Sequence, residues 1–152
     1  MSQLDNYNFL SPTGFKLIIN RERFSNLEFF ITAVTLPGIN TGTAEANSNQ
    51  YRGYLQGDLV FEELTLQIAI DEDMRVYKEL FDWMIENRNK NNPLTYDGTL
   101  VVLSNHNNPN NSIKLKNLFP TSISSVSFQT QVTDIEYMIL DISFRYDEFY
   151  FE

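Results

Sequence analysis

Few side chains of this sequence are of a type and spacing that could support catalysis. His106 is the only histidine, and it lies in SNHNNPN, a run of turn-forming residues that is typical of a surface loop. With one histidine and no cysteine, the sequence offers neither a set of zinc ligands nor the partners of a catalytic triad. We therefore expect no catalytic role for His106.

Acidic residues are adjacent at two places in the sequence. Asp71, Glu72 and Asp73 could bind a hard cation, but a helical pattern begins directly after them, so helix capping explains them better. Glu62 and Glu63 are neighbours in a strand pattern, where successive side chains point to opposite faces, so they do not form an acid and base pair. The phosphate-binding motifs GxxxxGK[ST] and GxGxxG are both missing. We expect no enzyme activity, no cofactor and no metal site.

One polar segment, residues 37–57, has side chains suited to binding another protein. Its far end contains Tyr51, Arg52 and Tyr54, which are residue types enriched in protein interfaces. Connections in small domains usually have about 4 to 6 residues, so a polar segment of this length is usually functional or disordered. We interpret it as a long loop that contacts another subunit. Folding back as a strand is the alternative, and a hairpin completed by a neighbouring subunit satisfies both interpretations.

The composition limits the class of protein. A chain of 152 residues with 42% hydrophobic and 14% aromatic residues has the length and apolar content of one globular domain, residues 1–152. The net charge of -9 disfavours a surface that binds nucleic acid phosphates. No segment approaches the roughly 18 apolar residues of a membrane helix, and the N-terminal residues lack the pattern of a signal peptide. We expect a soluble protein.

Most of the chain has the pattern of β-strands. Residues 1–13 are interpreted as an N-terminal arm, and FKLIIN and LEFFITAVTLP as two strands of a hairpin joined by the polar turn RERFSN. Apolar and polar residues alternate in LVFEELTLQIAI and in IEYMILDISFRYDEFYF, which predicts two half-buried strands. The segments GTLVVLS, SIKLKNLF and TSISSVSFQT complete the set of predicted strands.

One amphipathic helix, over residues 72–87, is predicted between the strands. In DEDMRVYKELFDWMIENRNK apolar residues recur every three or four positions, and Asp71 precedes them as an N-cap. We expect Phe81 and Met84 to be buried against the sheet and Trp83 to belong to the core. The predicted fold class is therefore mainly β (α+β), an antiparallel sandwich or small barrel with one packed helix.

The order of these elements and several local strings resemble the tail-tube proteins of contractile-tailed (myovirus) bacteriophages. The resemblance extends from the second predicted strand to the C-terminus. It rests on Arg52-Gly53 in the long loop and on the strings ITAVTLPGI, GDLVFEELTLQIAIDED, LFDWM and IKLKNLFPTSISSVSFQTQVTDIEYMILDISFRYDEFY.

The resemblance implies a structural protein of the virion tail. Hexameric rings of such subunits stack into a hollow tube, and DNA passes through the lumen without specific binding. The implied partners are further copies of the chain and the sheath and baseplate proteins, with assembly in the cytoplasm of the host bacterium. One sheet of each subunit would join its neighbours in an inner barrel, and the long loop would reach the adjacent ring. An acidic chain suits a conduit for DNA, because phosphate contacts supply most non-specific affinity.

The two best strand patterns supply candidates for side chains that line the lumen. Their polar faces carry Glu63, Thr65, Gln67, Asp141 and Ser143. The same faces could instead meet solvent on the outside.

Two alternatives to the tube subunit stay open. The chain could be a minor tube-like ring protein of the baseplate or hub, or of the end of the tube. It could also belong to another class, a monomeric β-sandwich binding module.

Overall fold

The computed structural model describes residues 9–48, 51–131 and 137–152. The strands and helices follow one another as β1 (Phe15–Ile19), α1 (Leu27–Phe30), β2 (Ile31–Thr35), β3 (Ile39–Ser48), β4 (Tyr51–Phe61), β5 (Leu64–Ala69), α2 (Arg75–Glu86), β6 (Tyr96–Leu103), β7 (Pro109–Ile123), β8 (Ile139–Arg145) and β9 (Glu148–Phe151).

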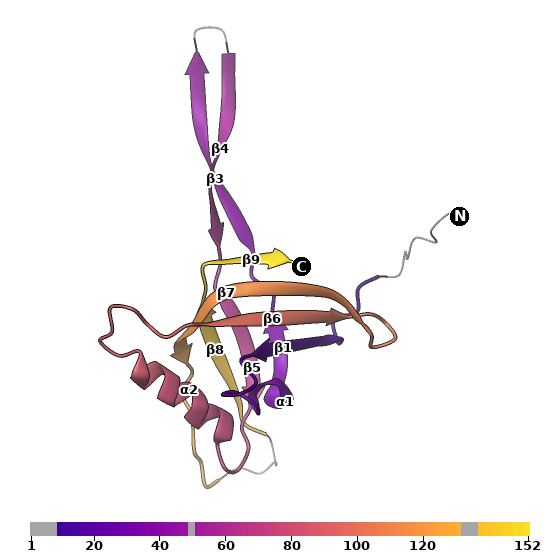
Figure 1. Cartoon of the computed structure of the whole chain (residues 1–152), viewed down its shortest axis with the longest axis vertical. Coiled ribbons are helices and arrows are strands. Elements are labelled where there is room, and N and C mark those ends of the chain that lie inside the picture. The colour runs from indigo at the N-terminus through magenta and orange to yellow at the C-terminus, as the bar shows by residue number, and fades with distance from the viewer. Residues whose placement is uncertain (1–8, 49–50, 132–136) are drawn as a thin grey trace.

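A seven-stranded antiparallel sheet forms the body of the molecule. Its strands are ordered β1-β6-β7-β8-β5-β2, and β9 pairs with β7 off this path. β7 is shared by two parts of the sheet, since residues 109–118 pair with β6 and residues 119–123 pair with β8. Figure 1 shows β1, β6 and β7 running across β5 and β8, with α2 against the body and the hairpin β3–β4 projecting from it. The predicted fold class is confirmed, with α1 as an additional short helix.

β7 changes direction at Asn117, whose φ of 57° lies in the left-handed region. Asparagine tolerates this conformation better than most residues that carry a side chain. Its main-chain N–H donates to Asp97 Oδ1 at 3.1 Å, and its side-chain amide donates to the carboxylate of Asp147. This irregularity allows Leu115 and Leu118 both to be buried, although they are three residues apart in a strand.

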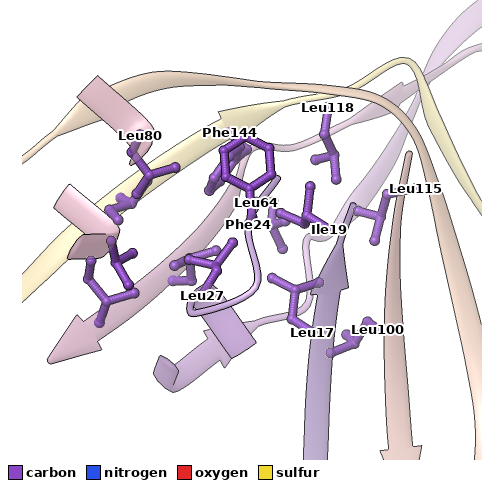
Figure 2. Close-up of a cluster of buried hydrophobic side chains, with 14 of the residues drawn as sticks. Leu17, Ile19, Phe24, Leu27, Leu64, Leu80, Leu100, Leu115, Leu118 and Phe144 are labelled. Carbon is purple, nitrogen blue, oxygen red and sulfur yellow. The ribbon is translucent and has the colours of Figure 1, made fainter. Parts of the chain in front are cut away.

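The core lies between the curled sheet and the two helices. Figure 2 shows side chains from β1, α1, β5, α2, β6, β7 and β8 converging in one cluster. Trp83 is fully buried in this core, as predicted, and its Nε1–H donates to the Leu94 carbonyl oxygen at 2.7 Å. Its ring lies 4.9 Å from the ring of Phe24 and 5.1 Å from the ring of Tyr96, measured between centroids.

The predicted buried face of the helix is wrong for Phe81, which is 49% exposed. The residues of α2 that reach the core are Val76, Leu80 and Trp83, while Met84 is half-buried. Apolar residues occupy several adjacent positions of this helix, so two stripes with helical spacing exist and the sequence does not select between them.

The start of the helix also differs from the prediction. α2 begins at Arg75, and its N-cap position is Met74, in a left-handed conformation. Asp71 Oδ1 nevertheless accepts a hydrogen bond from the main-chain N–H of Arg75 at 2.9 Å, so the acidic run does satisfy the first helical amide.

The predicted hairpin of the first two strands is wrong. β1 pairs with β6 and β2 pairs with β5, and the residues LEFF that start the second predicted strand form α1. Phe24 and Leu27 of the intervening segment are buried in the core. A connection that buries two large apolar side chains replaces the turn, so the strands separate into different parts of the sheet.

Two other predicted strands have different boundaries. The C-terminal pattern is divided into β8 and β9 by a turn at residues 146–147, and β9 returns to pair with β7. Residues 121–123 of TSISSVSFQT continue β7 and the following residues are not in a strand. Within the described residues, neither helix has both the length and the apolar content that crossing a membrane would require.

Candidate assembly surfaces

The segment predicted to be a long loop, residues 37–57, is instead most of a β-hairpin. β3 and β4 pair only with each other, in a two-stranded antiparallel sheet of their own. Figure 1 shows this hairpin extending well beyond the body along the longest axis of the molecule. Small and polar residues can form a hairpin when cross-strand hydrogen bonds satisfy the backbone. Because such strands have no apolar face, the sequence shows no alternation there, and the loop prediction is wrong.

The two faces of the hairpin carry different side chains. In the cross-strand register Leu55 lies opposite Ala44 and Tyr54 lies opposite Glu45, so these two pairs point to opposite faces. Arg52 shares the face of Tyr54, and both are exposed, Tyr54 to 76%. The side chain of Tyr51 lies outside what the structure describes. The predicted interface cluster is thus placed near the tip, with Arg52 and Tyr54 on one face.

Two glycines meet in the middle of the hairpin. A Cβ added at Gly57 would lie 2.8 Å from the main-chain oxygen of Gly42, so any larger residue at position 57 would force the strands apart. The register also shifts between Thr41 and Thr43. This local irregularity separates the half of the hairpin nearest the body from the half that ends at the tip.

Glu62 fixes the base of the hairpin to the body. Its main-chain N–H donates to the Gly38 carbonyl oxygen at 3.0 Å, and its carboxylate accepts from Asn40 Nδ2 at 2.9 Å. Its carbonyl oxygen accepts a hydrogen bond from the hydroxyl of Tyr146 at 2.7 Å. Burial, and then the nearby Glu62 carboxylate, raise the pKa of Tyr146 to about 12, so the phenol keeps its proton at neutral pH.

An aromatic contact supports the same junction. The Phe61 ring, at the end of β4, lies 5.1 Å from the Phe149 ring and 6.1 Å from the Tyr146 ring, both at steep angles. Edge-to-face pairs of this kind add to the stabilisation from burial alone. The C-terminal turn and β9 therefore hold the base of the hairpin, while the tip has no contact of this kind within the described residues.

The five predicted lumen candidates lie together on one face of the sheet. Thr65 is paired with Ser143, and Gln67 with Asp141, between β5 and β8. Glu63 joins this face through an ion pair with Arg145, at 3.0 Å between Oε1 and Nε. The opposite face of the same two strands is buried and consists of Leu64, Leu66, Ile68, Leu140, Ile142 and Phe144. The polar alternation thus correctly separates the core face from an open face.

The sheet ends in strands that are open on one side. Among the described residues, β2 pairs with β5 alone and β1 with β6 alone. Exposed apolar side chains accompany the edge at β2, with Phe29 exposed to 76% and Leu36 to 45%. An open edge presents unpaired backbone donors and acceptors, so another chain can add to it.

The residues considered for catalysis or metal binding do not form a common site. His106 is exposed in the turn between β6 and β7. Asp71 and Asp73 both pair with Arg75, at 3.7 and 2.9 Å. In the residues that the structure describes, no group of three or more His, Cys, Asp or Glu side chains is placed to hold a metal ion.

Comparison with known proteins identifies the family of this chain. A profile of the family described as phage tail tube protein matches residues 7–152. A search of curated protein sequences found no match.

Solved structures share the fold at low sequence identity. The tube-terminating cap of the anti-feeding prophage has a TM-score of 0.77 at 18% identity, over 99% of this chain and 95% of that one. A chain from the extended sheath–tube complex of the extracellular contractile injection system PVC has a TM-score of 0.76 at 20% identity, over 96% and 93%. A chain from the sheath/tube terminator of the PVC system has a TM-score of 0.74 at 18% identity, over 97% and 99%.

The family profile spans nearly the whole chain, and the solved structures share the fold over nearly the same residues. Both findings indicate the same family. The chain belongs to the phage tail tube proteins, which are structural components of the tail and not enzymes.

Proposed function

We propose that this protein forms hexameric rings that stack into the tube of a contractile tail, and that DNA passes through the lumen. The observation that carries the proposal is the projecting hairpin. A two-stranded hairpin alone in water is marginally stable at best, and this one extends beyond the body with Tyr54 and Leu55 exposed to 76% and 62%. Packing against another ring would bury these side chains and explain why they are exposed in a single copy.

The open edges of the sheet support lateral closure into a ring. β2 ends the order β7-β8-β5-β2 on one side, and residues 119–123 of β7 begin it on the other. If β2 of one subunit lies beside this part of β7 in the next, the strands continue around the ring and the exposed edges disappear. Such closure also accounts for the apolar residues Phe29 and Leu36 near that edge.

The polar face would line the lumen in this arrangement, because the core and α2 cover the other face of β5 and β8. Thr65, Gln67 and Ser143 carry no charge, and the charge of Glu63 is matched by Arg145. Asp141 leaves the face slightly acidic. Such a wall offers few cations to phosphates, so DNA can move along it with little adhesion.

The outer face of α2 is the candidate surface for a sheath. It exposes Phe81 and Ile85, to 49% and 43%, beside Asp82 and Glu86. The similar chain in the PVC system comes from a sheath–tube complex. Glu86 is paired with Arg23 at 2.9 Å, so the surface combines two apolar side chains with the carboxylate of Asp82. Such a surface suits a partner with a basic residue beside an apolar contact.

A terminal ring is the second candidate function. Similar structures include a tube-terminating cap and a sheath/tube terminator, at TM-scores of 0.77 and 0.74, against 0.76 for the sheath–tube complex. The fold is thus shared to the same degree with a chain of the sheath–tube complex and with two chains that end a tube.

Electron microscopy of the purified full chain tests these proposals. Long tubes with a hollow centre would support the repeated subunit. Single rings that do not elongate would support the terminal ring. A monomer at all concentrations and salt conditions would contradict both.

A further inference from the structure

An apolar groove lies at the end of the body away from the hairpin. It has a volume of about 290 Å³ and an apolar lining formed by Ile70, Met74, Val126, Phe128, Tyr137 and Met138. Phe128 is exposed to 76% and Tyr137 to 87%. Figure 1 shows the start of α2 and the segment after β7 at one end of the longest axis, with the hairpin tip at the other.

We propose that this groove receives the hairpin tip of a copy in the next ring, with Tyr54 against Phe128 and Tyr137. The proposal rests on the proposed function, in which rings stack, and adds the surface that accepts the hairpin. The groove exposes two aromatic side chains and the hairpin exposes one. Packing these three rings together would remove their apolar surface from water.

Charge complementarity favours the same partner. Arg52 is the only basic residue in residues 39–61, and it shares the exposed face of Tyr54. The groove is also lined by Asp71, whose carboxylate is paired with Arg75, and by Glu72, which is exposed. The hairpin face therefore presents Tyr54 with Arg52 and Glu45 next to it, and the groove presents two aromatic rings and Glu72. Contact of Arg52 with Glu72 would place opposite charges together between two copies.

The positions of the two surfaces also agree with stacking. A protrusion and its acceptor on one patch would produce a closed dimer, whereas surfaces at opposite ends of a subunit produce a head-to-tail series. With the hairpin at one end and the groove at the other, each ring repeats the contact in the same direction. The aromatic residues of the groove, which the fold of a single subunit leaves exposed, then have a role in elongation.

Disulfide cross-linking tests this contact, because the chain contains no cysteine of its own. The test variant carries Tyr54→Cys and Phe128→Cys. The matched control carries Leu55→Cys and Phe128→Cys, since Leu55 is the next residue but points to the opposite face of β4. All three side chains are exposed, and circular dichroism should show both variants folded.

Mild oxidation of assembled protein should give a ladder of linked chains on a non-reducing gel for the Tyr54 variant. We expect at least about tenfold less product for the Leu55 control, because a disulfide requires adjacent Cβ atoms. Equal products from both variants, or none from the Tyr54 variant, would overturn the groove assignment if the unmodified chain still forms tubes. A chain that forms no stacked rings would instead overturn the proposed function, and this contact with it.

A charge exchange gives an independent readout. Arg52→Glu should lower the extent of tube formation at low salt at least about fivefold, and adding Glu72→Arg to the same chain should restore most of it. Arg88→Glu, at an exposed position past the end of α2, is the control for net charge and should leave assembly unchanged. Failure of Glu72→Arg to restore assembly would place the acidic partner of Arg52 elsewhere.

Discussion

The hydroxyl of Tyr146 donates a hydrogen bond to the main-chain oxygen of Glu62, at 2.7 Å, and this bond joins the turn between β8 and β9 to the base of the hairpin. The same peptide segment is held by Gly38 and Asn40. The direction of the hairpin is therefore set by contacts at its base, and these can be changed without altering the tip.

Tyr146→Phe should weaken this junction while keeping the aromatic contacts with Phe61 and Phe149. Losing one neutral hydrogen bond lowers the free energy of unfolding by about 1 kcal/mol. Urea denaturation of the monomer measures the change, and tube formation should fall because the hairpin is held less firmly. Tyr150→Phe is the control, since the hydroxyl that bonds to Glu62 belongs to Tyr146, and the Tyr150 ring lies 5.4 Å from Lys116 Nζ on β7. Equal stability of the Tyr146 variant and the unmodified chain would contradict the role of this bond.

The exposed end of the hairpin should matter for assembly and not for folding. Replacing Tyr51, Arg52 and Tyr54 together by Ala should leave the circular dichroism spectrum of the monomer unchanged. Tubes or rings should become rarer in electron micrographs, since these residue types contribute most to interface energies. Lys78→Ala, at an exposed position of α2, is the control. Normal tube formation by the triple variant would exclude this cluster from the interface.

Adjacent residues of α2 should respond differently to truncation. Leu80 is fully buried, so Leu80→Ala should lower the free energy of unfolding by about 2 to 5 kcal/mol. Phe81 is 49% exposed, so Phe81→Ala should cost about 1 kcal/mol or less. Guanidinium denaturation measures the free energy of unfolding of both variants, which differ by one position in the same helix. A larger loss for Phe81 than for Leu80 would show that the other apolar stripe faces the sheet.

The carboxyl group of Glu79 should make stability depend on pH. Its Oε1 accepts from Asn26 Nδ2 at 3.1 Å, while its Oε2 is buried and has no hydrogen-bond partner among the residues that the structure describes. Burial, and to a smaller extent the charge of Asp71, raise the pKa of Glu79 above its ordinary value of 4.5. Because the folded state then binds the proton more tightly than the unfolded state, this contribution to stability is present below pH 4.5 and is lost as pH rises through the raised pKa.

Glu79→Gln removes this titration. The variant should be more stable than the unmodified chain at pH 7, and its stability should fall less between pH 4.5 and 7, as measured by thermal unfolding. Glu72→Gln, at an exposed carboxylate, controls for the loss of one negative charge. A Glu79 variant that is less stable at pH 7 would show that the ionised carboxylate stabilises the fold.

The proposed lumen can be tested by adding cations to it. Gln67→Lys combined with Asp141→Lys places two ammonium groups on neighbouring strands of the polar face. Tubes should still form and should retain DNA oligonucleotides, with retention decreasing steeply as salt increases. The control variant carries two lysines on the outer face of α2, Asp82→Lys and Glu86→Lys. It should bind DNA on the outside of the tube, where added nuclease digests it. Complete digestion of the DNA held by both variants would show that the polar face is not enclosed.

The sequence predicts the parts of the fold that depend on alternation along one strand. Thr65 and Gln67 on β5 and Asp141 and Ser143 on β8 share an open face, as their spacing requires. The local pattern does not predict which strands pair, because pairing depends on contacts between residues that are distant in sequence. The pattern of residues 15–20 and 27–37 fits a hairpin locally, but burial of Phe24 and Leu27 separates the two strands.

The candidate assembly surface was only partly accessible to sequence reasoning. The residue types of Tyr51, Arg52 and Tyr54 predict an interface, and this stays a prediction. The alternation in the hairpin that carries them is too weak to predict β3. The groove at the other end was missed, since Met74, Phe128 and Tyr137 are far apart in sequence and meet only in the fold. Exposed aromatic residues just after a strand, such as Phe128, are the one signal that could have indicated it.

The contact between Tyr146 and Glu62 joins residues separated by 84 positions in the chain. During translation, the hairpin leaves the ribosome long before the tyrosine that fixes its base has been made. A nascent chain therefore carries the hairpin without the support that sets its direction, and the support arrives only when most of the sheet is available to fold. The order of synthesis thus leaves the direction of the hairpin unset until the subunit is nearly finished.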